Sequence, residues 1–205
     1  MTTLYYAPGA CSLAPHIVLE WIGAPYEAVR VGFGSKELLA VNPAGCVPVL
    51  REDDGWLLTQ AGAILDYLAR KHPDAALSGG DGARAEADAH RWSSFFTSDM
   101  HASFWPIFFP QRYTTDDGDA AKQTVVDAGR NLVRARLALL DAHLEGRDWI
   151  LNGRSVVDAY AFPMIGWAIK LLPEGLEGAP NVQALHDRIA ADPAVRKVLA
   201  QEAEA

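Results

Sequence analysis

The segment from Tyr5 to Ser12 holds a thiol and a hydroxyl, two groups that can supply or stabilise a nucleophile. An aromatic and apolar stretch typical of a buried strand ends at Pro8-Gly9, and Cys11 and Ser12 follow where a helical spacing of apolar residues begins. Unpaired amides and the positive end of the helix dipole favour an anion there. The pattern predicts a lowered pKa and a stabilised thiolate at Cys11. The alternative is a small packing cysteine, because free cysteines are commonly buried.

A second segment, residues 42–50, brings a proline to the start of a strand. Asn42-Pro43-Ala44-Gly45 predicts a turn, and Val47 and Pro48 follow it. Most X–Pro bonds are trans, so the dipeptide by itself favours a trans bond. A proline at the start of this strand would leave the backbone of the preceding residue, Val47, free to bind an extended peptide ligand, as an exposed strand edge can.

The elements around these segments alternate in type. Strands are expected at residues 3–7, 26–31, 47–51 and 56–59, with Asp54-Gly55 as the turn of the last pair. Helical spacing covers residues 12–22 and 62–71, and residues 36–40 are long enough for one helical turn. The order predicts an α/β domain over residues 1–75.

A turn-rich stretch at residues 75–83 separates this part from a region with only helical periods. Helices are expected from residue 83 to about 109, from 119 to about 144, at 155–172 and at 182–190. A last helix should begin at Asp192-Pro193, because aspartate is a good cap and proline suits the first helical position. Residues 84–205 are therefore predicted to form an all-α domain.

Composition narrows the function classes. The 205 residues include 18 Lys and Arg against 26 Asp and Glu, a net charge of −8, which disfavours nucleic acid as a partner. No apolar stretch approaches the roughly 20 residues of a membrane-spanning helix. Two cysteines are too few for a disulfide scaffold, and no secretory signal is visible at the start. The expected location is the cytoplasm, with no membrane partner.

Taken together, these segments resemble the glutathione S-transferase family, and YYAPGACSLA at residues 5–14 is most similar to the bacterial beta class. NPAGCVPVL, LLTQAGAILDYL and SVVDAYAF follow in the family's order, so the resemblance covers nearly the whole chain. It implies a thioredoxin-like α/β N-terminal domain, an all-α helical bundle as C-terminal domain, glutathione as co-substrate and a homodimer.

The resemblance also assigns roles in the N-terminal domain. It implies a cis bond at Val47-Pro48, with the backbone of Val47 paired to the cysteinyl unit of glutathione. Cys11 matches the beta-class cysteine that contacts the glutathione sulfur and can form a mixed disulfide with it. Ser12 is expected as a second hydrogen-bond donor to that sulfur.

Three further residues match positions that bind the two ends of glutathione. Lys36 is expected to neutralise the glycine carboxylate, with a solvated lysine as the alternative. Gln60 matches the residue that binds the γ-glutamyl end, with a simple helix cap as the alternative. Ala61 stands where the family commonly has serine, which removes a hydroxyl, although an amide at a helix start still suits a carboxylate.

In the helical half, His101 matches a beta-class histidine that faces the cleft, and Asp99 matches an acidic residue that in some relatives reaches the partner subunit's glutathione amine. The alternatives are a histidine packed in an aromatic core and an exposed helix charge. Aromatic residues surround His101 and predict a core, a dimer interface or a pocket for apolar substrates: Trp92, Phe95, Phe96, Phe104, Trp105, Phe108 and Phe109.

Other polar motifs have structural explanations. Ser155 and Asp158 have the spacing of a capping box directly before an apolar helix, so we expect them to act in folding. The remaining histidines share no metal-ligand spacing, so no metal is predicted.

The predicted function is the addition of the glutathione thiolate to a small apolar electrophile. Two alternatives remain open. One is a glutathione-dependent thiol–disulfide oxidoreductase in which Cys11 is the nucleophile and Cys46 lies nearby. The other is a non-catalytic module of the same fold that binds ligands.

Overall fold

Four strands form one mixed sheet in the computed structural model, which describes residues 1–204. The central strand β1 (Thr2–Tyr6) pairs in parallel with β2 (Tyr26–Arg30) and antiparallel with β3 (Val49–Arg51). The edge strand β4 (Leu57–Thr59) is antiparallel to β3, which gives the order β2-β1-β3-β4. The two expected strand pairs on either side of residues 31–46 therefore join in a single sheet.

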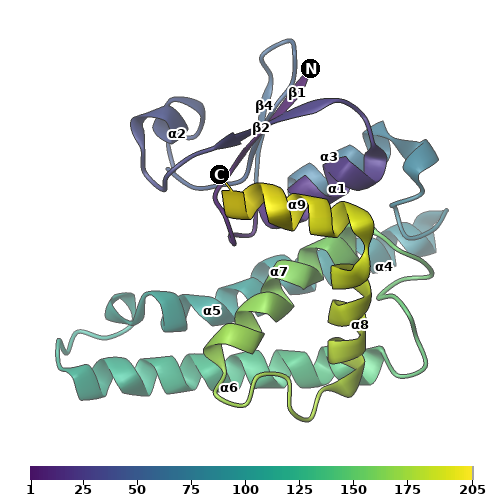
Figure 1. Ribbon diagram of the computed structural model, residues 1–205. Coiled ribbons are helices and arrows are strands. Elements are labelled where there is room, and N and C mark those ends of the chain that lie inside the picture. The colour runs from purple at the N-terminus through teal and green to yellow at the C-terminus, as the bar shows by residue number, and fades with distance from the viewer. Residues whose placement is uncertain (205) are drawn as a thin grey trace.

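Helices cover both faces of this sheet (Figure 1). α1 (Leu13–Ile22) and α3 (Ala61–Lys71) pack together on one face, and the short α2 (Lys36–Val41) lies on the other. Along β1, Leu4 and Tyr6 join the first core, whereas Tyr5 joins the second with Leu38 of α2. Burial on both faces explains why Leu4, Tyr5 and Tyr6 form a continuous apolar and aromatic run rather than an alternating pattern.

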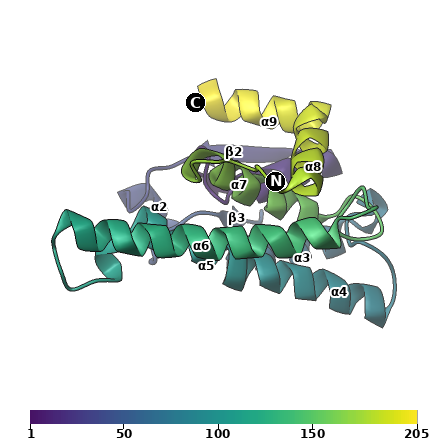
Figure 2. The same cartoon turned by 90° about the horizontal axis from the view of Figure 1, so that it is seen from below.

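In the part of the chain that the structure describes, the helical half contains six α-helices, most of which lie below the sheet in Figure 1. The longest, α6, runs alongside α5 at the bottom of the molecule in Figure 1, and in the view from below it crosses the front (Figure 2). The elements are α4 (Ala83–Ser94), α5 (His101–Phe108), α6 (Asp119–His143), α7 (Val156–Leu171), α8 (Pro180–Ala191) and α9 (Pro193–Glu204). The predicted fold class, a thioredoxin-like α/β domain followed by an all-α domain, is confirmed.

The single helix expected from residue 83 to about 109 is interrupted. Between α4 and α5 the chain forms a π-helical stretch, η2 (Phe95–Met100), which leads directly into His101. Short 3₁₀ turns, η1 (Pro73–Ala75) and η3 (Pro110–Arg112), also follow α3 and α5. Apolar spacing does not distinguish a π stretch from an α-helix over one or two turns, so these features were not predicted. π stretches often occur at functional sites.

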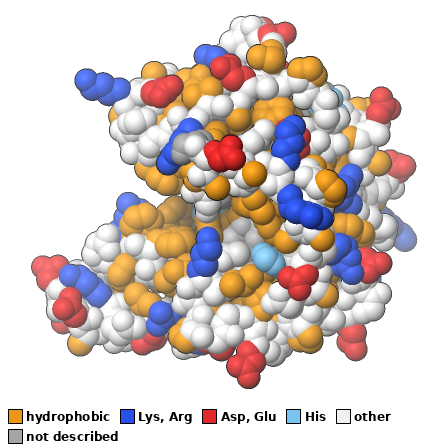
Figure 3. Space-filling model, in the orientation of Figure 1, with side chains coloured by type: hydrophobic (Ala, Val, Ile, Leu, Met, Phe, Trp, Pro, Cys, Tyr) orange, Lys and Arg blue, Asp and Glu red, His pale blue; other side chains and the backbone are white. Residues whose placement is uncertain are grey.

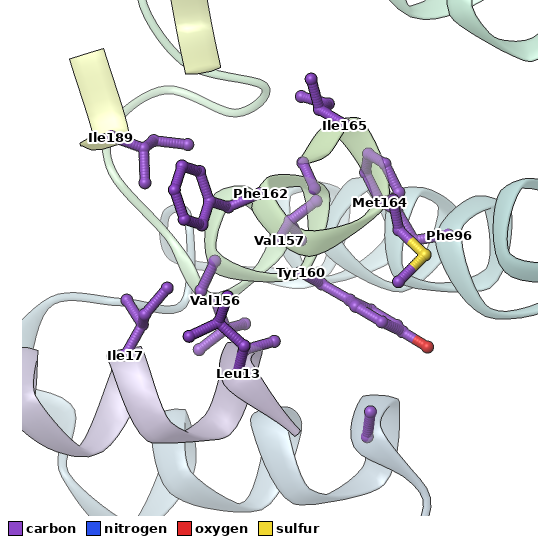
Figure 4. Packing of buried hydrophobic residues seen from close by; sticks show 14 of the residues in the cluster. Leu13, Ile17, Phe96, Val156, Val157, Tyr160, Phe162, Met164, Ile165 and Ile189 are labelled. Atoms are coloured by element: carbon purple, nitrogen blue, oxygen red, sulfur yellow. The ribbon is translucent and has the colours of Figure 1, made fainter. Parts of the chain in front are cut away.

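One hydrophobic core joins the two halves. α7 is buried along most of its length and packs against α1, where Leu13 and Ile17 face Val156 and Phe162 (Figure 4). In the same view, the ring of Tyr160 extends out of the cluster with its hydroxyl at the far end. α9 returns across α1 at the end of the chain (Figure 1). The relative position of the two halves is therefore fixed by shared burial.

Among residues 1–204, no helix combines the length and hydropathy required to cross a bilayer. The expected cytoplasmic location remains a prediction.

Candidate active site

Cys11 lies in the loop between β1 and α1, partly exposed, and its thiol donates to the carbonyl of Val47 at 3.6 Å. The Val47-Pro48 bond is cis, as the resemblance implied. Burial raises the pKa of the Cys11 thiol to about 12, against the smaller lowering by backbone amides at the helix start. The prediction of a lowered pKa is therefore wrong for the free protein, because removal of the thiolate from water costs more than the amides return.

Ser12 does not present its hydroxyl to a ligand. Its side chain is fully buried, accepts a hydrogen bond from the amide of Ala7 at 3.1 Å and donates to the carbonyl of Ala7 at 3.2 Å. The expectation of a second donor to the glutathione sulfur is therefore corrected: the hydroxyl proton is already used to close the turn before α1.

The helical domain holds the Cys11 loop from two sides. The amide of Gly9 donates to Glu202 of α9 at 3.1 Å, and the carbonyl of Gly9 accepts from the indole of Trp167 of α7 at 2.8 Å. Glu202 is buried and also contacts Nδ1 of His16 at 2.9 Å. The position of Cys11 thus depends on residues that are distant in the sequence.

The start of α3 is more accessible to solvent than the start of α1, where Ser12 is buried. Gln60 has φ +73°, a left-handed conformation that is unusual for a residue with a side chain, and it is exposed without a side-chain capping hydrogen bond. Gln60 therefore occupies the N-cap position of α3, but its side chain does not cap the helix. Ala61 is the first helical residue and is buried. Strain of this kind often occurs at ligand sites.

Lys36 and Asp99 are exposed, and neither forms an ion pair within the described residues 1–204. Lys36 is the first residue of α2, where the helix dipole disfavours a cation. The helix therefore does not stabilise the charged ammonium group of Lys36. Asp99 lies in η2, two residues before His101. Their expected roles toward glutathione remain predictions.

His101 faces Tyr160, with 3.1 Å between Nδ1 and the tyrosine hydroxyl. Its ring stacks on Trp105 and meets the edge of Trp167, yet it stays partly exposed, so it is neither a core histidine nor a solvated one. Burial lowers the pKa of His101 to about 4. The imidazole is therefore neutral near pH 7, with one nitrogen donating and one accepting.

Tyr160 is the residue that the sequence interpretation missed. It lies in the apolar helix after the capping box, where a buried tyrosine is expected as packing. Burial raises its pKa, and Cys11 is close enough that a thiolate there would raise the tyrosine pKa further. Its hydroxyl thus contacts His101 and lies within electrostatic reach of the Cys11 thiol, and only the tertiary structure reveals this.

The capping box itself is confirmed. The carboxylate of Asp158 accepts from the amide and hydroxyl of Ser155, both at 2.8 Å, and from the amide of Ile150 at 3.0 Å. Burial nevertheless raises the pKa of Asp158 to about 6. These contacts are those of a structural cap, and the role of both residues in folding stays a prediction.

The aromatic residues predicted around His101 differ in exposure, and Phe95 and Phe109 are half-buried. Trp92, Phe96 and Phe104 are buried in the core, whereas Trp105 and Phe108 are 36% and 37% exposed. Phe108 meets the edge of Trp167 at 5.1 Å between ring centroids. The space-filling view shows hydrophobic side chains that line a hollow between the two lobes, with basic side chains at its edge (Figure 3).

Within residues 1–204, no group of three or more His, Cys, Asp or Glu side chains is arranged to hold a metal ion. The prediction that no metal is required remains untested.

Both halves of the chain are similar in sequence to known proteins. Residues 4–76 match the family model for the glutathione S-transferase N-terminal domain, and residues 96–193 match that for the C-terminal domain. A glutathione S-transferase, GST-4.5, from Xanthomonas campestris pv. campestris is 39% identical over 203 residues, which cover 97% of this chain and 98% of the relative.

The fold is also similar to those of solved structures. A sphingomonad glutathione S-transferase complexed with glutathione aligns with a TM-score of 0.86 at 36% identity, over 99% of this chain and 100% of the other. A bacterial beta class glutathione S-transferase from Sphingomonas chungbukensis gives a TM-score of 0.86 at 36% identity, with 98% of each chain covered.

The fold and the loop that carries Cys11 therefore define an enzyme of the transferase class. The chain belongs to the glutathione S-transferase family, and its similarity is to the bacterial beta class.

Proposed function

We propose that this enzyme binds glutathione at the segment that leads into β3, around Val47, and transfers its thiolate to small apolar electrophiles in the hollow between the domains. The observation that carries this proposal is the arrangement of a protonated Cys11 thiol beside the Val47 carbonyl and close to the His101–Tyr160 pair. It combines a backbone acceptor, neutral donors and an apolar wall in one place.

Three features support glutathione as the co-substrate. The carbonyl of Val47 has only a weak S–H donor in the free protein, so an amide of the cysteinyl unit would be a stronger partner. At the start of α3, the exposed Gln60 side chain and the amide of Ala61 suit an α-amino acid group. The unpaired Lys36 suits the opposite carboxylate.

The high pKa of Cys11 supports conjugation over thiol–disulfide exchange. A thiol that stays protonated near pH 7 is a poor nucleophile, but it can donate a hydrogen bond to the sulfur of a bound glutathione. His101 can add a second donor: when the Tyr160 hydroxyl donates to Nδ1, the imidazole proton is on Nε2. Donors of this kind stabilise the glutathione thiolate more than its thiol.

The electrophile would lie against the exposed rings of α5 and α7. Trp105 and Phe108 are exposed and the half-buried Trp167 packs against Phe108, so the three rings offer an apolar surface. We also propose that the enzyme acts as a cytoplasmic homodimer in detoxification, with Asp99 directed to the partner subunit's glutathione amine. The exposed position of Asp99 leaves its carboxylate free for this role.

The test compares two activities in one pair of variants. Conjugation of glutathione to 1-chloro-2,4-dinitrobenzene and reduction of a mixed disulfide are measured for the parent, Cys11→Ala and the matched control Cys46→Ala. We expect Cys11→Ala to keep conjugation at about a tenth of the parent rate, because it loses one hydrogen-bond donor. Disulfide reduction should disappear in Cys11→Ala and persist in Cys46→Ala.

Loss of both activities in Cys11→Ala would instead identify Cys11 as the nucleophile and favour the oxidoreductase. Absence of both activities in the parent, with glutathione still bound in calorimetry, would favour a binding module.

A further inference from the structure

A ladder of stacked rings leads away from the active site along α5. His101 stacks on Trp105 with 5.3 Å between ring centroids and 15° between planes, and Trp105 stacks on Phe109 with 5.5 Å and 28°. The guanidinium of Arg112 lies 4.2 Å from the centroid of Phe109 and ends the series. We call these four residues the α5 ladder. His101 and Trp105 are four residues apart on one face of α5, and Phe109 and Arg112 continue the series in the residue after α5 and in η3.

Arg112 differs from the other arginines that stack on aromatic rings. Those four each have a polar partner for the guanidinium, and three of the partners are carboxylates. They are Arg51 with Thr3, Arg91 with Asp88, Arg154 with Asp192 and Arg188 with Asp148. In the part of the chain that the structure describes, the Arg112 side chain forms neither an ion pair nor a hydrogen bond.

The guanidinium of Arg112 is a local cation on a protein whose overall charge is negative. The chain carries a net charge of −8, so its average field repels anions, and an anionic substrate would need a local cation. Asp116 and Asp117 follow Arg112 in the next loop, but Asp116 accepts from the amide of Gly118 at 2.8 Å and neither forms an ion pair with the guanidinium. The five donors of Arg112 are therefore available for a planar acceptor.

The two ends of the ladder set the shape of a ligand. His101 lies beside Tyr160 at the reacting end, and about two helical turns, roughly 12 Å, separate it from Phe109. Trp105 is 36% exposed between them, and because its faces pack against His101 and Phe109, a flat ligand would lie across the exposed ring edges along this distance. A guanidinium that lies over a ring and has no other partner suits a carboxylate at the end of a conjugated molecule.

We infer that the α5 ladder selects planar, two-ring electrophiles that carry a carboxylate at the end remote from the reacting carbon, with Arg112 as the residue that determines this specificity. The inference rests on the proposed conjugation for its kinetic readout. An apolar pocket alone would not discriminate by charge. The α5 ladder would make the enzyme prefer a negatively charged group at a fixed distance from the reacting carbon.

The experiment uses a matched pair of electrophiles, 4′-chloro-3′-nitrobiphenyl-4-carboxylate and the corresponding 4-carboxamide, with 1-chloro-2,4-dinitrobenzene as a short neutral reference. In the parent, kcat/KM for the carboxylate should exceed that for the carboxamide by about tenfold at low ionic strength. This preference should shrink as salt is added. Arg112→Gln should remove it, and Arg112→Lys should restore part of it.

Exposed Arg147, which also forms no ion pair in the described residues, supplies the matched control, and Arg147→Gln should behave like the parent. Conjugation of the two neutral electrophiles should stay within about twofold in Arg112→Gln, because Arg112 is remote from the reacting end. An equal loss for all three electrophiles, or an unchanged carboxylate preference, would overturn the inference.

A binding measurement separates this inference from the proposed reaction. Unreactive biphenyl-4-carboxylate and its carboxamide are titrated by calorimetry into the parent and Arg112→Gln, with glutathione present and absent. Tighter binding of the carboxylate only in the parent supports the ladder even if no conjugation is detected. Equal affinities of the two compounds for the parent would refute it even if conjugation proceeds.

Discussion

Two helices of the N-terminal domain begin beside the proposed glutathione site, and their first turns differ. At α1 the Ser12 hydroxyl is buried against Ala7, and the preceding loop is fixed by Glu202. At α3 no side-chain cap is present, and Gln60 is exposed in a left-handed conformation. Both helix starts carry the same kind of dipole, but only that of α3 is left open to an anion.

The difference shows that a helix N-terminus is not by itself an anion site. The dipole contributes about 0.3–1 kcal/mol at an exposed end, whereas burial of a charge costs several times more. At Cys11 burial dominates and raises the pKa. We therefore expect α1 to position a neutral thiol and α3 to bind a charged end of glutathione.

The largest expected effect is on thiol reactivity. At pH 8 iodoacetamide should alkylate exposed Cys46 at least about 100 times faster than Cys11, because the raised pKa leaves little Cys11 thiolate. The Cys11 rate should rise about tenfold per pH unit from pH 7 to 10, below its pKa. Mass spectrometry of timed digests measures both rates. Faster reaction at Cys11 would mean that the start of α1 is as open as that of α3.

The next effect is on stability. Ser12→Ala removes two buried hydrogen bonds and leaves the Ala7 amide and carbonyl without this partner, so the free energy of unfolding should fall by about 1–3 kcal/mol. Urea unfolding measures the loss. The control Ser98→Ala removes an exposed hydroxyl that bonds Ser94, and it should change stability by less than about 0.5 kcal/mol. Equal losses in the two variants would contradict the closed turn at α1.

The smallest expected effect is that of Gln60→Gly, which should raise the stability of the free protein and lower its affinity for glutathione. Gln60→Gly should stabilise the free protein by up to about 1 kcal/mol, because glycine adopts φ +73° without strain. Glutathione affinity in calorimetry should fall severalfold, since the side chain is lost. Gln60→Ala, which keeps the strain, is the matched variant for the binding loss alone. A stable Gln60→Gly variant with unchanged affinity would remove Gln60 from the site.

Much of the fold was predictable because its signals are local. Apolar spacing and turn residues located the strands and most helices, and the capping box at Ser155 and Asp158 marked the start of α7. The π-helical stretch at Phe95–Met100 was not predicted, since its apolar spacing resembles that of the flanking α-helices.

The residue types at the site were also set by the sequence: a thiol at a helix start, a proline before a strand and a histidine among aromatic residues. The chemical state of these groups, by contrast, depends on the folded arrangement. The pKa of Cys11 depends on burial, His101 meets a tyrosine 59 positions away, and Gly9 is held by a carboxylate 193 positions away. Desolvation and hydrogen bonding depend on which side chains surround a group in space, and a local pattern does not contain that information.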